Sequence, residues 1–449
     1  MANFAKSSAP RFSMDVYQNE FLPEGGREVN AIVTVTATGG GTIGGAVGAP
    51  HLYAPGQAPS AAVAVMVDCS GSMDYPPAKM RNAREATAAA IDTLRDGVRF
   101  AVIGGTHVAT EVYPGRRPGS RSPTPPPATR PKQALRRLSA GGGTAIGTWL
   151  RLADRLLSSA DVAIRHGILL TDGRNEHESP EELQRALTEC AGRFTCDARG
   201  VGTDWEVKEV TGIASALLGT ADIVADPAAL AADFTHMMET AMGKEVADVA
   251  LRVWTPVGTA IKFVKQVAPT VEELTDRRTE AGPRAGDYPT GSWGDESRDY
   301  HLCVEVPAAN VGREMLAARV SLVVPQPDGS VHNLGAQGLV RAVWTDDVVA
   351  STAISPQVAH YTGQAELAQV IQQGIDLRKA GDLDGATAKL GRAVQLASAS
   401  GNADTAKLLA KVVDVVDAAT GTVRLKAKVA EADEMTLETR STKTVRVKK

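Results

Sequence analysis

The chain has 449 residues, of which 43% are hydrophobic and only 4% aromatic, and its formal net charge is −4. This length gives room for two or three domains of roughly 100–200 residues each. The weakly acidic balance provides no overall positive field to hold nucleic acid or anionic lipid. No apolar stretch approaches the ~20 residues that span a bilayer, and the amino-terminal residues lack the apolar core of a signal peptide. We therefore expect a soluble, cytoplasmic protein that binds neither membrane nor nucleic acid.

The first predicted elements in chain order are two strands, at 11–17 and 28–36, where valine and isoleucine are frequent. A stretch rich in glycine and proline over 39–59 is typical of a linker. The two strands have no sheet of their own nearby, and a lone hairpin is marginally stable in water. We therefore expect residues 1–45 to join a sheet that forms later in the chain.

The pattern changes at Ala61, where short apolar runs begin to alternate with helical segments. Strands are predicted at 61–67, 98–105, 106–113, 163–171, 195–202 and 221–224, and helices at 77–94, 132–138, 146–159, 180–191, 205–217 and 227–242. Continuously apolar runs suit strands buried on both faces of a parallel sheet, and the alternation indicates a doubly wound α/β fold. We predict such a domain over 60–243, with a surface loop at 114–131 because proline, arginine and serine dominate there.

Strand-like runs separated by proline and glycine follow at 246–257, 260–267, 301–306, 316–324 and 337–344. This spacing is typical of an antiparallel β-sandwich, which we place over 244–350. The amino-terminal strands would complete it, so that the parallel domain is an insertion between its two parts. All of these assignments together predict a mostly parallel α/β sheet inserted in an antiparallel sandwich.

The last quarter of the chain returns to helical periodicity. Residues 355–420 carry small residues at positions typical of helical hairpins and resemble a degenerate pair of tetratricopeptide-type helices. Such repeats need at least three copies to stand alone, so we expect these helices to pack on the sandwich. Residues 421–449 have few large apolar side chains and carry five lysines and three arginines. This composition predicts a flexible basic tail.

Five oxygen-bearing side chains follow the predicted parallel strands at the ends where ligands bind in open α/β sheets. Asp68, Ser70 and Ser72 alternate directly after the first buried strand, with Gly71 between the serines. Thr144 follows three consecutive glycines, and Asp172 ends the strand at 163–171. Strands one and four of such a sheet are neighbours, which brings Asp172 beside Asp68. Carboxylate and hydroxyl oxygens are the donors that Mg²⁺ or Mn²⁺ prefers, so the sequence predicts a divalent cation site.

This constellation resembles the metal-ion-dependent adhesion site of the von Willebrand factor type A family, over roughly residues 61–242. The family pattern is Asp-x-Ser-x-Ser, a distant Thr and a distant Asp, and all five positions are present. The resemblance implies that Ser70, Ser72 and Thr144 contact Mg²⁺ (or Mn²⁺ or Ca²⁺) directly, with Asp68 and Asp172 in the same shell or just behind it. It also implies an open coordination position, which an Asp or Glu of a partner protein fills.

Enzyme and RNA-binding functions are the alternatives. No Gly-Lys-[Ser/Thr] loop for phosphates and no Gly-x-Ser-x-Gly elbow is present, and we expect a protein without catalytic residues. Scarce aromatics give few surfaces for base stacking. The four cysteines, Cys69, Cys190, Cys196 and Cys303, lack metal-binding spacing and favour separate reduced thiols.

The basic tail suggests a second mode of binding. Thr442 and Thr444 each have valine three residues later, which resembles the phosphothreonine motif read by bacterial forkhead-associated domains. Phosphate at either threonine would add nearly two negative charges. The resemblance to von Willebrand factor type A proteins as a whole implies an intracellular bacterial adaptor or scaffold, in a signalling, stress or ATPase-linked complex.

Overall fold

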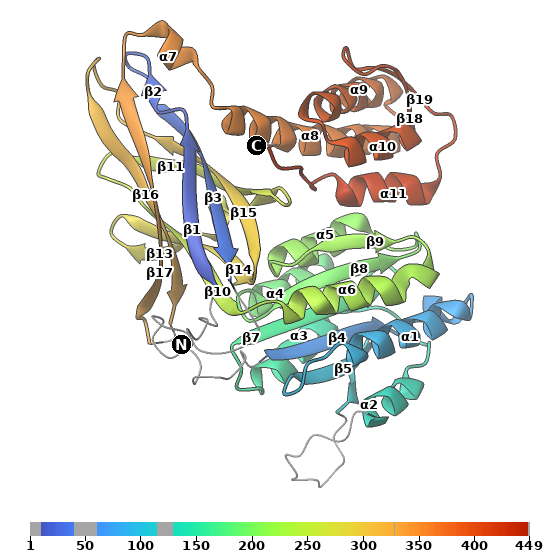
Figure 1. The fold of residues 1–449 in the computed structure, drawn as a ribbon. Helices are drawn as coiled ribbons and strands as arrows, with labels where there is room; N and C mark the ends of the chain where they lie inside the picture. The colour runs from blue at the N-terminus through green and yellow to red at the C-terminus, as the bar shows by residue number, and fades with distance from the viewer. Residues whose placement is uncertain (1–9, 40–60, 115–128, 327, 448–449) are drawn as a thin grey trace, which may run out of the picture. The chain divides into compact units, whose positions relative to one another are not determined.

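The computed structural model describes residues 10–39, 61–114, 129–326 and 328–447, and the chain divides into two compact units. Residues 53–247 form the site unit, and residues 1–52 with 248–449 form the sandwich–helix unit. The predicted fold class, an α/β sheet inserted in an antiparallel sandwich and followed by helices, is confirmed (Figure 1). Nearly all of the predicted linker at 39–59 and most of the loop at 114–131 lie outside the described residues.

The site unit is built on a six-stranded sheet in the order β6-β5-β4-β7-β8-β9. Every neighbouring pair is parallel except β5–β6. Because β4 lies in the middle of the sheet and is covered on both faces, all eight of its residues are buried. The strands are β4 (Ala61–Asp68), β5 (Arg99–Gly105), β6 (Thr110–Tyr113), β7 (Ile164–Thr171), β8 (Thr195–Val201) and β9 (Ala221–Val224).

Helices cover both faces of this sheet (Figure 1). On one face, α1 (Ala78–Asp92) and α6 (Leu230–Met242) pack on the odd-numbered valines of β4, from Val63 to Val67. On the other face lie α3 (Ile146–Ser158), α4 (Pro180–Cys190) and α5 (Val207–Ala216). The start of α4 follows from its sequence, because Ser179 and Glu182 exchange side-chain to backbone hydrogen bonds in a capping box. The shorter helices are η1 (Gly71–Asp74), α2 (Thr129–Ala134), η2 (Leu135–Arg137) and η3 (Pro227–Ala229).

The sandwich has a five-stranded sheet, β1-β3-β15-β11-β12, and a six-stranded sheet, β13-β14-β10-β16-β17-β2. As predicted, the amino-terminal strands enter it, because β3 pairs with both β1 and β15. Buried and exposed residues alternate along the second half of β17, as expected for a strand with one face in solvent. Its elements are β1 (Arg11–Gln18), β2 (Phe21–Leu22), β3 (Glu28–Thr38), β10 (Val246–Trp254), β11 (Ala260–Ala268), β12 (Glu272–Glu273), η4 (Thr275–Arg277), β13 (Thr279–Gly282), β14 (Ala285–Trp293), β15 (Glu296–Glu305), β16 (Glu314–Pro325) and β17 (Val331–Trp344).

The carboxy-terminal helices pack on this sandwich, as the sequence predicts. Val358 and Tyr361 share a buried apolar cluster with Ile32, Val267 and Ala268 of the sandwich strands. A second cluster forms among the helices themselves and includes Leu390 and Leu409. The elements are α7 (Val348–Thr352), α8 (Pro356–Lys379), α9 (Leu383–Ser400), α10 (Ala403–Val412), β18 (Val413–Asp417), β19 (Thr422–Leu425) and α11 (Glu431–Arg440).

The prediction of a flexible tail over 421–449 is wrong for its described part. Residues 422–425 form β19, which pairs with β18, and α11 buries Leu437 completely. The segment after α11 is also bound, because the hydroxyl of Thr444 donates to the carbonyl of Val267 at 2.6 Å. A few well-placed apolar side chains and backbone hydrogen bonds are therefore enough to order a segment whose overall composition is polar.

Two further predictions concern the chain as a whole. Within the described ranges, no helix has both the length and the apolar character needed to cross a membrane. All four cysteines are buried and none forms a disulfide. Burial raises the pKa of the Cys69 and Cys190 thiols to about 12, so both stay protonated at neutral pH.

Candidate metal centre

Asp68 stands at the carboxyl end of β4 and is fully buried. Its Oδ1 accepts a hydrogen bond from the amide of Ser70 at 2.8 Å, which closes a tight turn. Its Oδ2 accepts from the hydroxyl of Thr171 at 2.7 Å and from the amide of Asp172 at 3.3 Å. The carboxylate therefore ties the loop after β4 to the end of the neighbouring strand β7.

Asp172 directly follows β7 and is also fully buried. Its Oδ1 accepts from the hydroxyl of Ser72 at 2.7 Å, and its Oδ2 accepts from the ammonium of Lys79 at 2.7 Å. Since β4 and β7 are paired, the two aspartates lie side by side, as predicted. Burial and the charge of Asp172 raise the pKa of Asp68, while hydrogen bonds from Ser70 and Thr171 oppose that shift. Two adjacent buried carboxylates favour a cation beside them.

A third loop, residues 141–144, lies against the loop after β4. The amide of Gly141 donates to the carbonyl of Cys69 at 2.8 Å, and the amide of Gly71 donates to the carbonyl of Gly142 at 2.9 Å. Gly142 has φ of +81°, a backbone conformation that glycine adopts without strain. The glycine run therefore lets two backbones approach closely and delivers Thr144 to the site.

The three hydroxyl groups converge on one point beside Gly173. A Cβ atom on this glycine would lie 3.2 Å from Ser72 Oγ, 3.8 Å from Thr144 Oγ1 and 3.9 Å from Ser70 Oγ. The two serine oxygens are 2.9 Å apart, and neighbouring ligands of an octahedral ion with bonds of about 2.1 Å are about 3 Å apart. The residues present therefore fit a small, hard divalent cation.

The site does not depend on a cluster of the usual strong ligands. In the described parts of the chain, no three His, Cys, Asp or Glu side chains gather as a metal-binding group. The donors here are hydroxyls backed by two carboxylates, a set that suits Mg²⁺ or Mn²⁺ better than a soft metal.

Two histidines, His107 and His177, hold the glycine loop in place. His177 Nδ1 accepts from the amide of Thr144 at 3.2 Å, and His107 Nδ1 accepts from the amide of Gly143 at 3.4 Å. The amide of His177 also donates to the carbonyl of Thr144 at 2.9 Å. These histidines lie far apart in sequence and have no metal-ligand spacing, so only the fold reveals this role.

The loop after β7 also fixes the start of α3, which begins two residues after Thr144. Asn175 Oδ1 accepts from the amide of Ile146 at 2.8 Å, and Glu178 Oε1 accepts from the amide of Gly147 at 2.6 Å. These acceptors satisfy amides that a helix start leaves unpaired, and a carboxylate there complements the helix dipole. The loop that carries Asp172 thus positions Thr144 as well.

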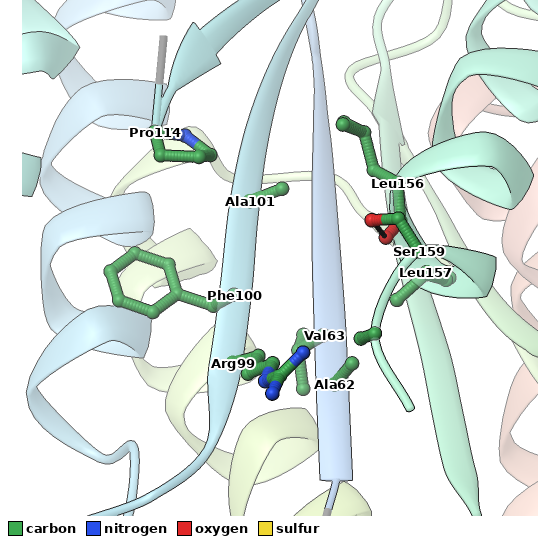
Figure 2. A pocket seen from close by; sticks show the side chains of 10 residues that line it. Ala62, Val63, Arg99, Phe100, Ala101, Pro114, Leu156, Leu157 and Ser159 are labelled. Atoms are coloured by element: carbon green, nitrogen blue, oxygen red, sulfur yellow. Dashed lines mark hydrogen bonds between the residues drawn. The ribbon is translucent and has the colours of Figure 1, made fainter. Parts of the chain in front are cut away.

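A hollow of about 160 Å³ lies at the opposite end of the same strands (Figure 2). It is lined by Ala62 and Val63 at the start of β4, by Phe100 on β5, and by Leu156 at the end of α3. Its walls are mostly apolar, with the Arg99 side chain at one side (Figure 2). The amino ends of β4 and β5 line this hollow, so it is separate from the candidate metal centre at their carboxyl ends.

The two threonines singled out for phosphorylation lie in the bound segment after α11. The carbonyl of Thr442 accepts from the amide of Val271 at 2.8 Å, and the amide of Thr444 donates to Pro269 at 2.9 Å. The Thr444 hydroxyl is engaged with Val267. Phosphorylation stays a prediction, and a phosphate on Thr444 would have to break this last bond.

Comparison with known proteins finds similar solved structures over nearly the whole length of the chain. A solved von Willebrand factor type A structure from Catenulispora acidiphila is 50% identical, covers 100% of this chain and 99% of that chain, and superposes with a TM-score of 0.88. The ArnB paralog VWA2 from Sulfolobus acidocaldarius is 13% identical, covers 98% of this chain and 100% of its own, and shares the fold with a TM-score of 0.59.

The von Willebrand factor type A C-terminal domain matches residues 395–441, from α9 to just past α11. No functionally curated protein has a significantly similar sequence. Identity of 50% over the full length, with the same fold throughout, shows that the chain belongs to the von Willebrand factor type A family.

Proposed function

We propose that this chain is a metal-dependent protein–protein interaction module, which holds a divalent cation through Ser70, Ser72 and Thr144. The observation that carries the proposal is the convergence of three hydroxyl oxygens beside Gly173, backed by two buried carboxylates. A Mg²⁺ ion prefers six oxygen ligands, and three hydroxyls leave it unsaturated. When bound there, the cation would offer its open position to an Asp or Glu side chain of a partner protein.

The chain's own residues support this docking role in three ways. Asp68 and Asp172 supply negative charge while engaged in hydrogen bonds to the loops. His177 and Asn175 fix Thr144 and α3, so that little has to move when a partner arrives. Ser72 and Gly71 are exposed, which gives a partner access to the site. We further propose that this interaction module acts as an adaptor in the bacterial cytoplasm.

Catalysis by a nucleophile in the same loop has less support. The thiol of Cys69, the side chain next to Asp68, donates to the carbonyl of Val67 at 3.4 Å and is buried. Its raised pKa keeps it protonated, whereas a reactive cysteine is a thiolate. The serine hydroxyls are engaged with each other and with Asp172. We therefore favour binding over turnover.

The proposal is tested with Thr144→Ala, which removes one direct ligand and leaves the carboxylates untouched. Titration with Mn²⁺ by calorimetry should give one site in the wild type and a loss of at least about tenfold in affinity in the variant. Thr188→Ala is the matched control, because Thr188 is exposed on α4 and bonds only within its helix.

The same three proteins then serve as baits in native extract with Mg²⁺ or with EDTA. A partner captured by the wild type and by Thr188→Ala in Mg²⁺ only, and lost with Thr144→Ala, supports the docking role. Equal capture in every lane would show that the cation is not the docking point.

A further inference from the structure

Lys79 is a positive charge placed directly against the metal centre. Its ammonium lies 2.7 Å from Asp172 Oδ2, 3.3 Å from the carbonyl oxygen of Ser72 and 3.5 Å from Asp204 Oδ2. Only 11% of the Lys79 side chain is exposed, and that of Asp172 is fully buried, whereas that of Asp204 is 72% exposed. Asp172 is therefore the partner that holds the lysine, because the exposed pair is screened by solvent.

The position of Lys79 is unfavourable for a cation by itself. It is the second residue of α1, which runs Ala78–Asp92. The start of a helix carries partial positive charge and disfavours lysine there. Burying an ammonium also costs free energy unless it is paired. The ion pair with Asp172 supplies the compensation, so the local contacts account for a residue that helix preferences alone disfavour.

We propose that Lys79 is the resident counter-ion of the site, which neutralises Asp172 when no divalent cation is bound. This inference rests on the proposed metal site. Without metal, Lys79 is the only cation within hydrogen-bond distance of the Asp172 carboxylate among the interactions that the structure describes. With metal, the divalent charge compensates the same carboxylate, and the lysine contributes less.

Lys79 should weaken metal binding, because protein conformation and ligand binding are thermodynamically linked. A group that stabilises the metal-free form more than the metal-bound form weakens metal binding by the difference. Lys79 therefore lets the site release its cation without leaving a buried, unpaired carboxylate, which would be strongly destabilising. Asp172 keeps the hydrogen bond that Ser72 donates to its Oδ1 and the bond from its own amide to Asp68, so two contacts remain to hold it without the lysine. The Asp172 carboxylate is therefore paired with a cation whether or not the divalent ion is bound.

The test compares wild type, Lys79→Met and Lys79→Arg by Mn²⁺ calorimetry and by thermal unfolding with Mn²⁺ or EDTA. Lys79→Met should bind Mn²⁺ tighter by about tenfold or more and should lose thermal stability mainly in EDTA. Lys79→Arg keeps the charge and should stay close to wild type. Lys132→Met is the matched control, since Lys132 pairs with Asp92 on the surface and should change neither measurement.

A double variant keeps the test decisive if Lys79→Met folds poorly without metal. Lys79→Met should cost much less stability in EDTA when Asp172→Asn has already removed the carboxylate charge, because the pair is then gone. Equal loss in both backgrounds, or unchanged Mn²⁺ affinity in a folded Lys79→Met, would overturn the inference. Absence of Mn²⁺ binding by the wild type would instead overturn the metal site itself.

Discussion

Two buried aspartates of this protein have similar partners and different surroundings. Asp172 in the site unit accepts from a serine hydroxyl and a lysine, and Asp299 in the sandwich–helix unit accepts from the Tyr361 hydroxyl and faces Arg446 at 3.3 Å. Both side chains are almost fully buried. One hydroxyl and one cation therefore do not by themselves distinguish a functional carboxylate from a structural one.

The difference lies in what surrounds each carboxylate. The hydroxyls of Ser70 and Thr144 lie within 4 Å of the Cβ position of Gly173, the residue after Asp172, and glycine leaves that position open. Around Asp299, Tyr361 and the segment after α11 close the site, and Val447 packs against the same apolar cluster. A carboxylate beside spare oxygen donors and open space can recruit an ion, whereas an enclosed one joins two layers of the fold. The first kind should therefore govern ligand affinity and the second kind stability.

The largest effect should come from Asp299→Ala. It leaves Tyr361 and Arg446 without their acceptor, and loss of one member of a buried ion pair costs about 3–5 kcal/mol. Because Arg446 is partly exposed, we expect the lower end, about 3 kcal/mol. Urea unfolding should report this loss, while Mn²⁺ affinity stays unchanged. Asp346→Ala, at an exposed position, is the control, and equal effects of the two variants would remove the structural role of Asp299.

Gly173→Ala should have the next largest effect and the opposite signature. Its methyl group would occupy the point where the hydroxyls of Ser70, Ser72 and Thr144 converge. We expect Mn²⁺ affinity to fall by about a hundredfold, or about 2.7 kcal/mol, with little change in urea unfolding. Gly212→Ala is the matched control, since a Cβ there meets no atom within 4 Å. Retained affinity in Gly173→Ala would place the cation elsewhere.

The smallest effect should come from His177→Ala, which tests whether the surroundings are held in place. The variant loses the acceptor of the Thr144 amide but keeps the backbone bond to its carbonyl. Loss of a residue that orients a ligand typically costs 10–100-fold in metal affinity, and we expect about tenfold by calorimetry. His236→Ala, exposed on α6, should bind like wild type. An unchanged His177→Ala would mean that the glycine loop holds Thr144 alone.

Much of the site unit could be predicted from its sequence because its strands are continuously apolar and its helices amphipathic. Edge strand β6 and every later helix of the site unit lie within a few residues of their predicted bounds. The pairing of β4 with β7, and with it the neighbourhood of Asp68 and Asp172, followed from the fold class. Lys79 was missed because a single lysine in a helix has no pattern. Its place in the first helical turn, where cations are disfavoured, was the available signal.

The sandwich–helix unit was harder to predict, for local reasons. Strand β14 contains Gly286, Pro289 and Gly291, which are typical of a loop, and only its pairing with β10 and β13 makes it a strand. Strand β18 follows α10 without a break, so the helical periodicity predicted over 355–420 includes Val413–Asp417, which the structure forms as a strand. In the tail, Met435 and Leu437 supply the burial of α11. Tertiary contacts outweighed local preference in each case.

The place of the site unit within the chain bears on the order of events during synthesis. Strand β3 pairs with β15, and their residues Thr36 and Ser297 are 261 positions apart. The ribosome therefore completes all six strands of the site unit before it makes the strand that β3 must find. A segment that has already collapsed into its own core shortens the loop that this pairing has to close, which lowers its entropic cost. The α/β fold of the site unit is thus the part of the nascent chain that can mature first, while the amino-terminal strand β3 pairs with β15 only after that strand has been synthesised.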